Sequence, residues 1–191
     1  MKRRIFCKTT ASVLLSLGIN PIFALSNTSN KVLLGEIFVN NKLVKGSFEN
    51  LNNATIESKN SKAVLKVEND VFLIKANSKI KFISNKINEI IRGSLHGVFA
   101  KRQEELLIKI PKGTIGIRGT AIFLELDPYK NKSSLCNCFG YTVIYDFNGK
   151  LVKSLKNSKN DMHSAVVISD EGVHSINKFK HDIVKKEFLR G

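Results

Sequence analysis

The sequence predicts an all-β fold, either a sandwich or roll or a short β-solenoid of many short strands, with a short helix at the C-terminus. Short runs of apolar and β-branched residues recur at spacings of about 8–12 residues, and turn-forming Asn, Asp and Gly residues separate them. Helical periodicity is clear only near the C-terminus, where Phe179 and Ile183, and then Val184 and Phe188, form i,i+4 pairs. These patterns together favour strands throughout, followed by one terminal helix.

Several of the predicted strands form hairpins, because a short polar turn joins each pair. The turn at 68–70 joins two apolar runs, and the turn at 169–172 joins two more. In chain order, the predicted strands are 32–39, 43–44, 63–67, 71–74, 80–83, 106–110, 141–145, 166–168 and 173–176.

Three segments are less regular. The segment 87–98 is mixed in character and is interrupted by Gly93 and Gly97, whereas the segment 115–126 predicts either two strands or one bent strand. The segment 151–160 is rich in Lys, Ser and Asn and predicts a mobile connection.

The chain of 191 residues fits one domain with a short appendage. We expect a signal segment over 1–26, a β domain over 27–150 and a C-terminal unit over 151–191 that consists of a hairpin and the short helix. Apolar residues make up 42% of the chain, which is enough for a folded core. No long apolar run follows residue 25, so a membrane protein with several spans is excluded.

The formal net charge of +15 makes nucleic acid the first partner to consider. Removing the four positive charges of the predicted signal segment leaves +11, carried mostly by scattered lysines and by Arg92, Arg102, Arg118 and Arg190. Phosphate and base recognition relies on the bidentate fork of arginine and on clustered basic and aromatic side chains. We therefore expect no nucleic-acid partner, and the charge predicts a solvated cationic surface or attraction to an acidic surface or anionic ligand.

The segment 1–26 has the three parts of a secretory signal peptide. Lys2-Arg3-Arg4 is a basic start, 11–19 is a short apolar stretch, and Pro21 precedes small residues. The apolar stretch is too short to span a bilayer comfortably, which favours cleavage over a retained anchor. We expect a periplasmic or secreted mature protein that is not an integral membrane protein.

The residues 2–8, KRRIFCK, resemble the twin-arginine export motif. Lys2 stands where Ser or Thr is usual and Cys7 where Leu is usual, so a general secretory signal is the alternative. The two pathways differ in consequence, because twin-arginine substrates are exported folded and often with a cofactor already loaded.

Two stretches of the mature chain resemble the FecR domain family, and together they cover about residues 31–126. The first runs from Gly35 through Asn40-Asn41 to the run at 71–74, and the second is Gly116-Ile117-Arg118-Gly119-Thr120, which is similar to the strand that closes FecR domains. FecR itself passes a periplasmic signal from an outer-membrane transporter to a cytoplasmic sigma factor. The resemblance implies an exported binding or signalling module. Only a few residues precede the apolar segment, so we do not expect an anti-sigma role.

The motif residues Gly116, Arg118, Gly119 and Thr120 suggest close packing around a bend. The two glycines leave space for a close approach of backbone. We expect Arg118 to donate hydrogen bonds to turn carbonyls, with anion binding as the alternative.

Two cysteines remain after the predicted cleavage, and a subgroup of FecR-like proteins has a similar Cys-x-Cys followed by histidines. Here these residues are Cys136, Cys138, His163 and His181. They would make a closed Cys₂His₂ site for zinc or another transition metal, and haem is a related possibility. We expect His96, alone between Leu95 and Gly97, to be a turn or packing residue.

A disulfide between Cys136 and Cys138 competes with the metal site, since disulfides are the usual state in exported proteins. On a strand, however, residues i and i+2 hold their Cβ atoms about 6–7 Å apart, whereas a disulfide requires about 3.8 Å. A metal site, a disulfide and two separate thiols therefore all stay open at this stage.

Catalytic motifs are absent from the sequence. It contains no nucleophile elbow, no phosphate-binding glycine loop and no metalloprotease helix motif. Glu104 and Glu105 are adjacent, so their carboxylates diverge on a strand or a helix. We expect a non-catalytic module that binds an envelope protein or a glycan, with a metal- or haem-binding protein or a structural envelope component as alternatives.

The predicted signal peptide gives a direct test of export. Mass spectrometry of the protein from its source cell is expected to find a mature N-terminus near Leu25 or Asn27, because cleavage follows the small residues there. Recovery of chains with an intact Met1 in the membrane fraction would contradict this expectation.

Overall fold

The computed structural model describes residues 30–127, 129, 131–157 and 163–176. Within these ranges the chain forms strands and turns and no helix, which confirms the all-β prediction. The predicted signal segment, the short C-terminal helix and His181 lie outside the described residues. None of the described residues belongs to a helix that is long and apolar enough to cross a membrane.

The described part of the chain contains sixteen strands, most of which alternate buried and exposed side chains. Their bounds are β1 Asn30–Leu34, β2 Ile37–Val39, β3 Lys42–Val44, β4 Ser47–Phe48, β5 Ala54–Ser58, β6 Ala63–Val67, β7 Asp70–Ile74, β8 Ser78–Ile83, β9 Lys86–Val98, β10 Leu106–Ile110, β11 Gly113–Ile117, β12 Ala121–Asp127, β13 Lys132–Tyr145, β14 Leu151–Asn157, β15 Ser164–Ser169 and β16 Gly172–Ile176.

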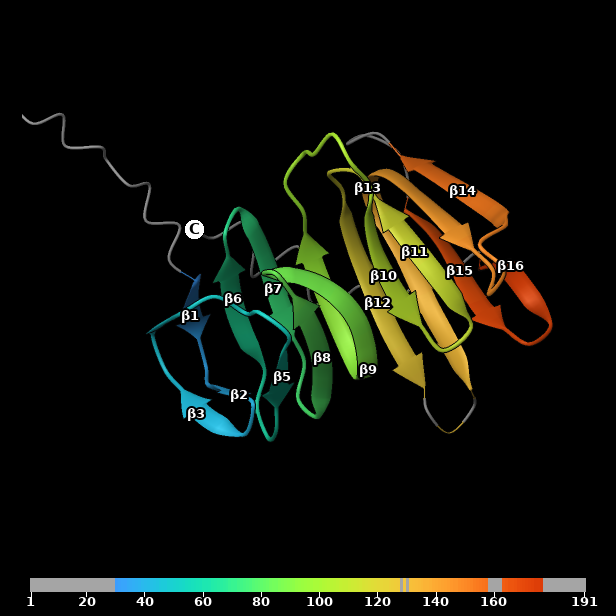
Figure 1. Ribbon diagram of the computed structural model, residues 1–191. Coiled ribbons are helices and arrows are strands. Elements are labelled where there is room, and N and C mark those ends of the chain that lie inside the picture. Colours follow the sequence, from blue (N-terminus) through green and yellow to red (C-terminus); the bar gives the residue numbers. More distant parts are fainter. Residues whose placement is uncertain (1–29, 128, 130, 158–162, 177–191) are drawn as a thin grey trace, which may run out of the picture.

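The strands form two layers, which we call sheet A and sheet B (Figure 1). Sheet A has the order β4-β1-β6-β7-β9-β12-β13-β15-β16. Sheet B has the order β3-β2-β5-β8-β9-β10-β11-β13-β14. Both orders follow the chain closely, so the chain winds from one end of the sandwich to the other.

The main core lies between the two sheets. Leu65 and Phe72 of sheet A and Ile56 and Ile80 of sheet B are at most 1% exposed and belong to one apolar cluster. Burial of this inner face by β-branched and aromatic side chains is what holds the two layers together.

Two long strands, β9 and β13, belong to both sheets. The first half of β9 pairs with β8, and after Gly93 the strand pairs with β7 and β12. Gly93 has φ +83°, and a Cβ there would lie 2.6 Å from the Cα of Ser78, so no other residue fits this bend easily. The glycines predicted as interruptions of 87–98 therefore lie inside one continuous bent strand.

The segment predicted as a mobile connection is also a strand, which corrects the prediction for 151–160 over its described part. β14 pairs with β13 from Gly140–Asn157 to Tyr145–Leu151. It lies at the edge of sheet B, where polar side chains face solvent at little cost, and this explains its unstrandlike composition. The hairpin predicted at 166–176 is confirmed as β15 and β16.

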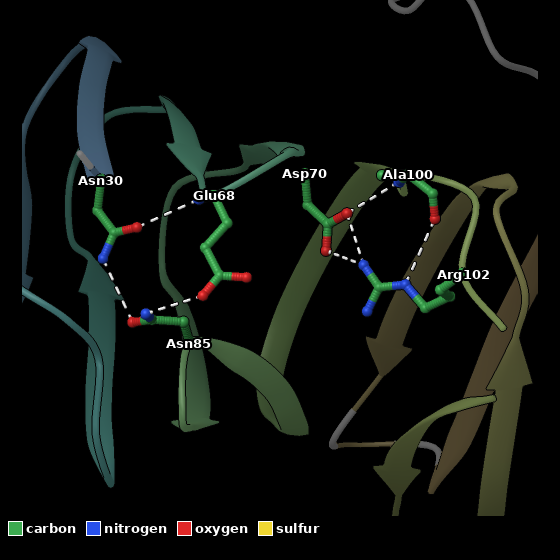
Figure 2. A network of polar contacts seen from close by, with 6 residues as sticks. All are labelled: Asn30, Glu68, Asp70, Asn85, Ala100 and Arg102. Carbon is green, nitrogen blue, oxygen red and sulfur yellow. Dashed lines mark hydrogen bonds and ion pairs between the residues drawn. The ribbon is translucent and has the colours of Figure 1, made fainter. Parts of the chain in front are cut away.

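Two polar networks lie near the β6–β7 turn (Figure 2). Arg102 Nη2 donates to both carboxylate oxygens of Asp70, at 2.7 and 2.5 Å, and the Ala100 N–H donates to Asp70 Oδ1 at 2.8 Å. These bonds fix the connection between β9 and β10 against β7.

The second network holds β1 to the turn between β8 and β9 (Figure 2). Asn30 Nδ2 donates to Asn85 Oδ1 at 3.3 Å, and Asn85 Nδ2 donates to Glu68 Oε1 at 3.1 Å. The Glu68 N–H closes the ring by donating to Asn30 Oδ1 at 3.2 Å.

Candidate metal centre

Cys136 and Cys138 lie on β13. Because they are two residues apart on a strand, their side chains point to the same face. Cys136 is fully buried, Cys138 is half-buried, and His163 lies exposed immediately before β15. One ligand atom from each of the three residues lies within 4.8 Å of the other two. Cys136 Sγ is 3.7 Å from Nδ1 of His163.

Strand pairing explains why His163 reaches the cysteines. β15 is antiparallel to β13, and its register pairs Ser164 with Asn137 and Ala165 with Cys136. The residue before Ser164 therefore falls beside Cys138.

Asn137, the residue between the two cysteines, is fully buried and saturates its amide with hydrogen bonds. Its Nδ2 donates to the carbonyls of Gly140 at 3.1 Å and Leu155 at 3.2 Å. Its Oδ1 accepts from the hydroxyls of Thr120 at 2.9 Å and Thr142 at 3.2 Å. The amide thus ties β13 to β14 and to Thr120, the residue before β12, at the point where β13 passes from sheet A to sheet B.

The same network extends to Ser164, the residue after His163. Asn157 Nδ2 donates to the backbone carbonyl of Asn137 at 2.7 Å, and Ser164 Oγ donates to Asn157 Oδ1 at 2.7 Å. The start of β15, and with it His163, is held to the cysteine strand by side-chain bonds as well as by the ladder.

The motif Gly116–Thr120 supports this crossing point, a role that the sequence did not reveal. The Thr120 hydroxyl also contacts the Phe139 carbonyl, and Gly140 has φ +89° with Thr120 so close that a Cβ would lie 2.8 Å from it. Gly119 has φ +78°, and a Cβ there would lie 2.6 Å from the Cα of Lys101. The close approach of backbone expected at the motif is confirmed at Gly119. Thr120 links the motif to the strand that holds the cysteines.

Arg118 differs from the expectation. Its side chain is 55% exposed, and Nε lies 3.6 Å from Oε1 of Glu105. Among the described residues no carbonyl accepts a hydrogen bond from it, and it lies in the bend just after β11, where its side chain is exposed.

Without a bound cation, the surroundings of Cys136 disfavour its thiolate form. The hydrogen bond with Cys138, and then burial and the charge of Cys138, raise the pKa of the Cys136 thiol. A cation between the sulfurs reverses this cost, since a coordinating thiol loses its proton to the metal.

The predicted ligands fall into two groups, and one histidine outside the predicted set lies beside them. The structure brings Cys136, Cys138 and His163 together. His181 lies outside the described residues. His96, expected to be a turn or packing residue, is a buried member of strand β9 whose Nε2 lies 3.9 Å from Cys138 Sγ.

The residues present fit a transition metal. Two sulfurs and an imidazole are donors that zinc and Cu(I) accept readily. In a tetrahedral site with ligand bonds of about 2.0–2.3 Å, the donors are about 3.3–3.8 Å apart, and Cys136 and His163 are already at that separation.

Replacing Asn137 tests whether its amide organises this region. Asn137→Ala removes the bonds of the amide to two carbonyls and two hydroxyls, and we expect a loss of about 3 kcal/mol in the free energy of unfolding, measured by urea denaturation. The matched control Asn148→Ala, in an exposed turn, is expected to change it by less than about 0.5 kcal/mol. Equal stability of the two variants would show that the network does not matter.

No family model matches this chain, and no curated protein matches its sequence. Two crystal structures of a candidate anti-sigma factor from Parabacteroides distasonis ATCC 8503 are similar in fold, with TM-scores of 0.53 and 0.51. The sequence identities are 8% and 9%, and each alignment covers 65% of this chain and 59% of the other. The chain therefore spans about three fifths of the length of those structures, and at this identity the similarity concerns the fold alone.

Proposed function

We propose that this chain is an exported, FecR-like binding module in a signalling pathway, and that the ligand it binds is a transition metal ion, with zinc first. The observation that carries the proposal is the convergence of Cys136, Cys138 and His163, whose ligand atoms all lie within 4.8 Å of one another. These residues come from β13 and from the residue before β15, and buried hydrogen bonds hold both segments.

The kind of ion follows from the donors. Sulfur and imidazole ligands favour zinc and copper over magnesium or calcium, which prefer oxygen. No carboxylate belongs to the cluster among the described residues. The buried position of Cys136 also limits access of water, which strengthens the interaction of a thiolate with a cation.

The non-catalytic character is supported by how the carboxylates near the motif are used. Glu105 accepts a hydrogen bond from the Tyr145 hydroxyl at 2.7 Å and pairs with Arg118. The hydrogen bond raises the pKa of Tyr145. Glu104 is exposed on the neighbouring position. In the described part of the chain, the partners of Glu105 are thus a hydroxyl and a guanidinium, whereas a general acid–base pair needs a second carboxyl group.

A signalling role is supported by the similarity in fold to a candidate anti-sigma factor and by the FecR-like motif. The binding partner is then an envelope protein or a glycan, because these are the molecules that an exported module encounters. The module acts through binding, with its metal site as the element that changes state.

Elemental analysis tests the metal site. Mature protein purified without chelator is expected to hold one metal ion per chain and to show two titratable thiols after denaturation. Cys138→Ser is expected to lose the ion and to melt at a lower temperature, since a bound ion at 1,000 times its Kd adds about 4 kcal/mol.

Wild-type protein stripped by a chelator is the matched control and should melt where Cys138→Ser melts. No metal together with no titratable thiol would mean that a disulfide joins Cys136 and Cys138, and the proposal would then be wrong.

Affinity capture from an envelope extract tests the signalling role. Metal-loaded protein is expected to retain one envelope protein or glycan that Cys138→Ser retains at least about tenfold less, which corresponds to 1.4 kcal/mol. Equal retention by the metal-loaded protein and by Cys138→Ser would show that partner binding does not depend on the metal. Turnover of an envelope substrate by the purified protein would contradict the non-catalytic assignment.

A further inference from the structure

One row of side chains crosses sheet A through five strands. The ladder pairs residue with residue from β7 to β15, in the order Leu73, His96, Phe123, Cys136 and Ala165. Residues directly opposite one another in neighbouring strands point to the same face of a sheet. His96 and Cys136 therefore share a face.

This face is the one turned away from the main core. Leu95, Leu124 and Leu135, the chain neighbours of residues in the row, belong to the core between the sheets. Phe123, Cys136 and Ala165 form a separate small cluster, against which Cys138 packs. The row is nevertheless buried, because Cys136 is 0% and His96 is 3% exposed.

His96 lies beside this cluster and contacts Cys138. Its Nε2 lies 3.9 Å from Cys138 Sγ, and its ring packs edge-on against Phe123 at a centroid distance of 6.4 Å. His163 meets the other cysteine, since its Nδ1 lies 3.7 Å from Cys136 Sγ. Two thiol–imidazole pairs are thus present, and the two sulfurs that join them lie within 4.8 Å of one another.

We propose that His96 is the fourth protein ligand of the metal ion, in a closed Cys₂His₂ set with Cys136, Cys138 and His163. This inference rests on the proposed metal-binding function and names the ligand that completes it. Four protein donors fill a tetrahedral coordination sphere. An ion with bonds of about 2.0–2.3 Å draws the two thiol–imidazole pairs toward a common centre.

The fourth ligand decides what the site does. A set closed by protein ligands leaves no position for a substrate, so the ion is structural or regulatory and not catalytic. His96 belongs to β9, which runs through both sheets, whereas the other ligands belong to β13 and to the residue before β15. Metal binding through His96 therefore clamps β9 to β13 across β12, and loss of the ion releases that clamp.

Cobalt(II) substitution of the full mature chain tests this ligand. Tetrahedral cobalt with two thiolates shows intense visible bands and sulfur-to-cobalt charge transfer, which report both affinity and coordination. His96→Gln is expected to weaken cobalt binding by at least about 10–100-fold, the loss that even an outer-shell partner causes. His174→Gln, which changes an exposed histidine on β16, is the matched control and should bind cobalt as the wild type does.

Two further variants keep the test decisive if His96→Gln is unstable. In His96→Ala, added imidazole is expected to restore the wild-type cobalt spectrum. His96→Cys is expected to retain the ion with stronger sulfur-to-cobalt charge transfer, because a third thiolate replaces the imidazole. Melting curves of the metal-free variants separate a ligand effect from a folding defect.

The outcomes distinguish this inference from the proposed function. If Cys138→Ser abolishes cobalt binding while the His96 variants bind as the wild type does, His96 is not a ligand and the metal site stands without it. If His181→Gln removes the ion and His96→Gln does not, the fourth ligand is His181. If the wild type binds neither cobalt nor zinc, the proposed function itself fails.

Discussion

The amide of Asn137 holds the point on which the candidate site depends. At this point β13 leaves sheet A for sheet B. Two bonds of the amide stay within β13, at Gly140 and Thr142. The other two reach Leu155 of β14 and Thr120, the residue before β12. A buried amide with unmet bonds is costly, so the crossing has one favoured geometry. The cysteines on either side of Asn137 face the opposite direction, and their placement follows from that geometry.

Thr120 and Gly140 connect the crossing to the motif that resembles FecR domains. The Thr120 hydroxyl reaches the Asn137 amide, and Gly140 allows β13 to bend against Thr120 without a clash. The motif thus supports the cysteine strand through packing and one hydrogen bond, while Arg118 points to solvent. These contacts explain why a threonine follows Gly119 in the motif. They also explain how a motif distant from the cysteines in sequence supports the cysteine strand.

Local patterns in the sequence were enough to predict the hairpins and the placement of the two cysteines on one face. Alternation at 63–67 and the turn at 169–172 identified real hairpins, and the Cys-x-Cys spacing placed two sulfurs on one face of a strand. It could not predict that β9 and β13 each serve two sheets, because a bent strand and two strands separated by glycine have the same pattern. The proximity of His96 to Cys138 depends on the register of three strands, β9, β12 and β13, and no local signal encodes that register.

Anomalous diffraction from crystals of the mature protein, grown without chelator, tests the central claim most directly. We expect one anomalous peak at the zinc or copper edge, within about 2.0–2.3 Å of the sulfurs of Cys136 and Cys138 and of an imidazole nitrogen. Continuous density joining the two sulfurs at about 2.0 Å, with no anomalous peak beside them, would contradict it.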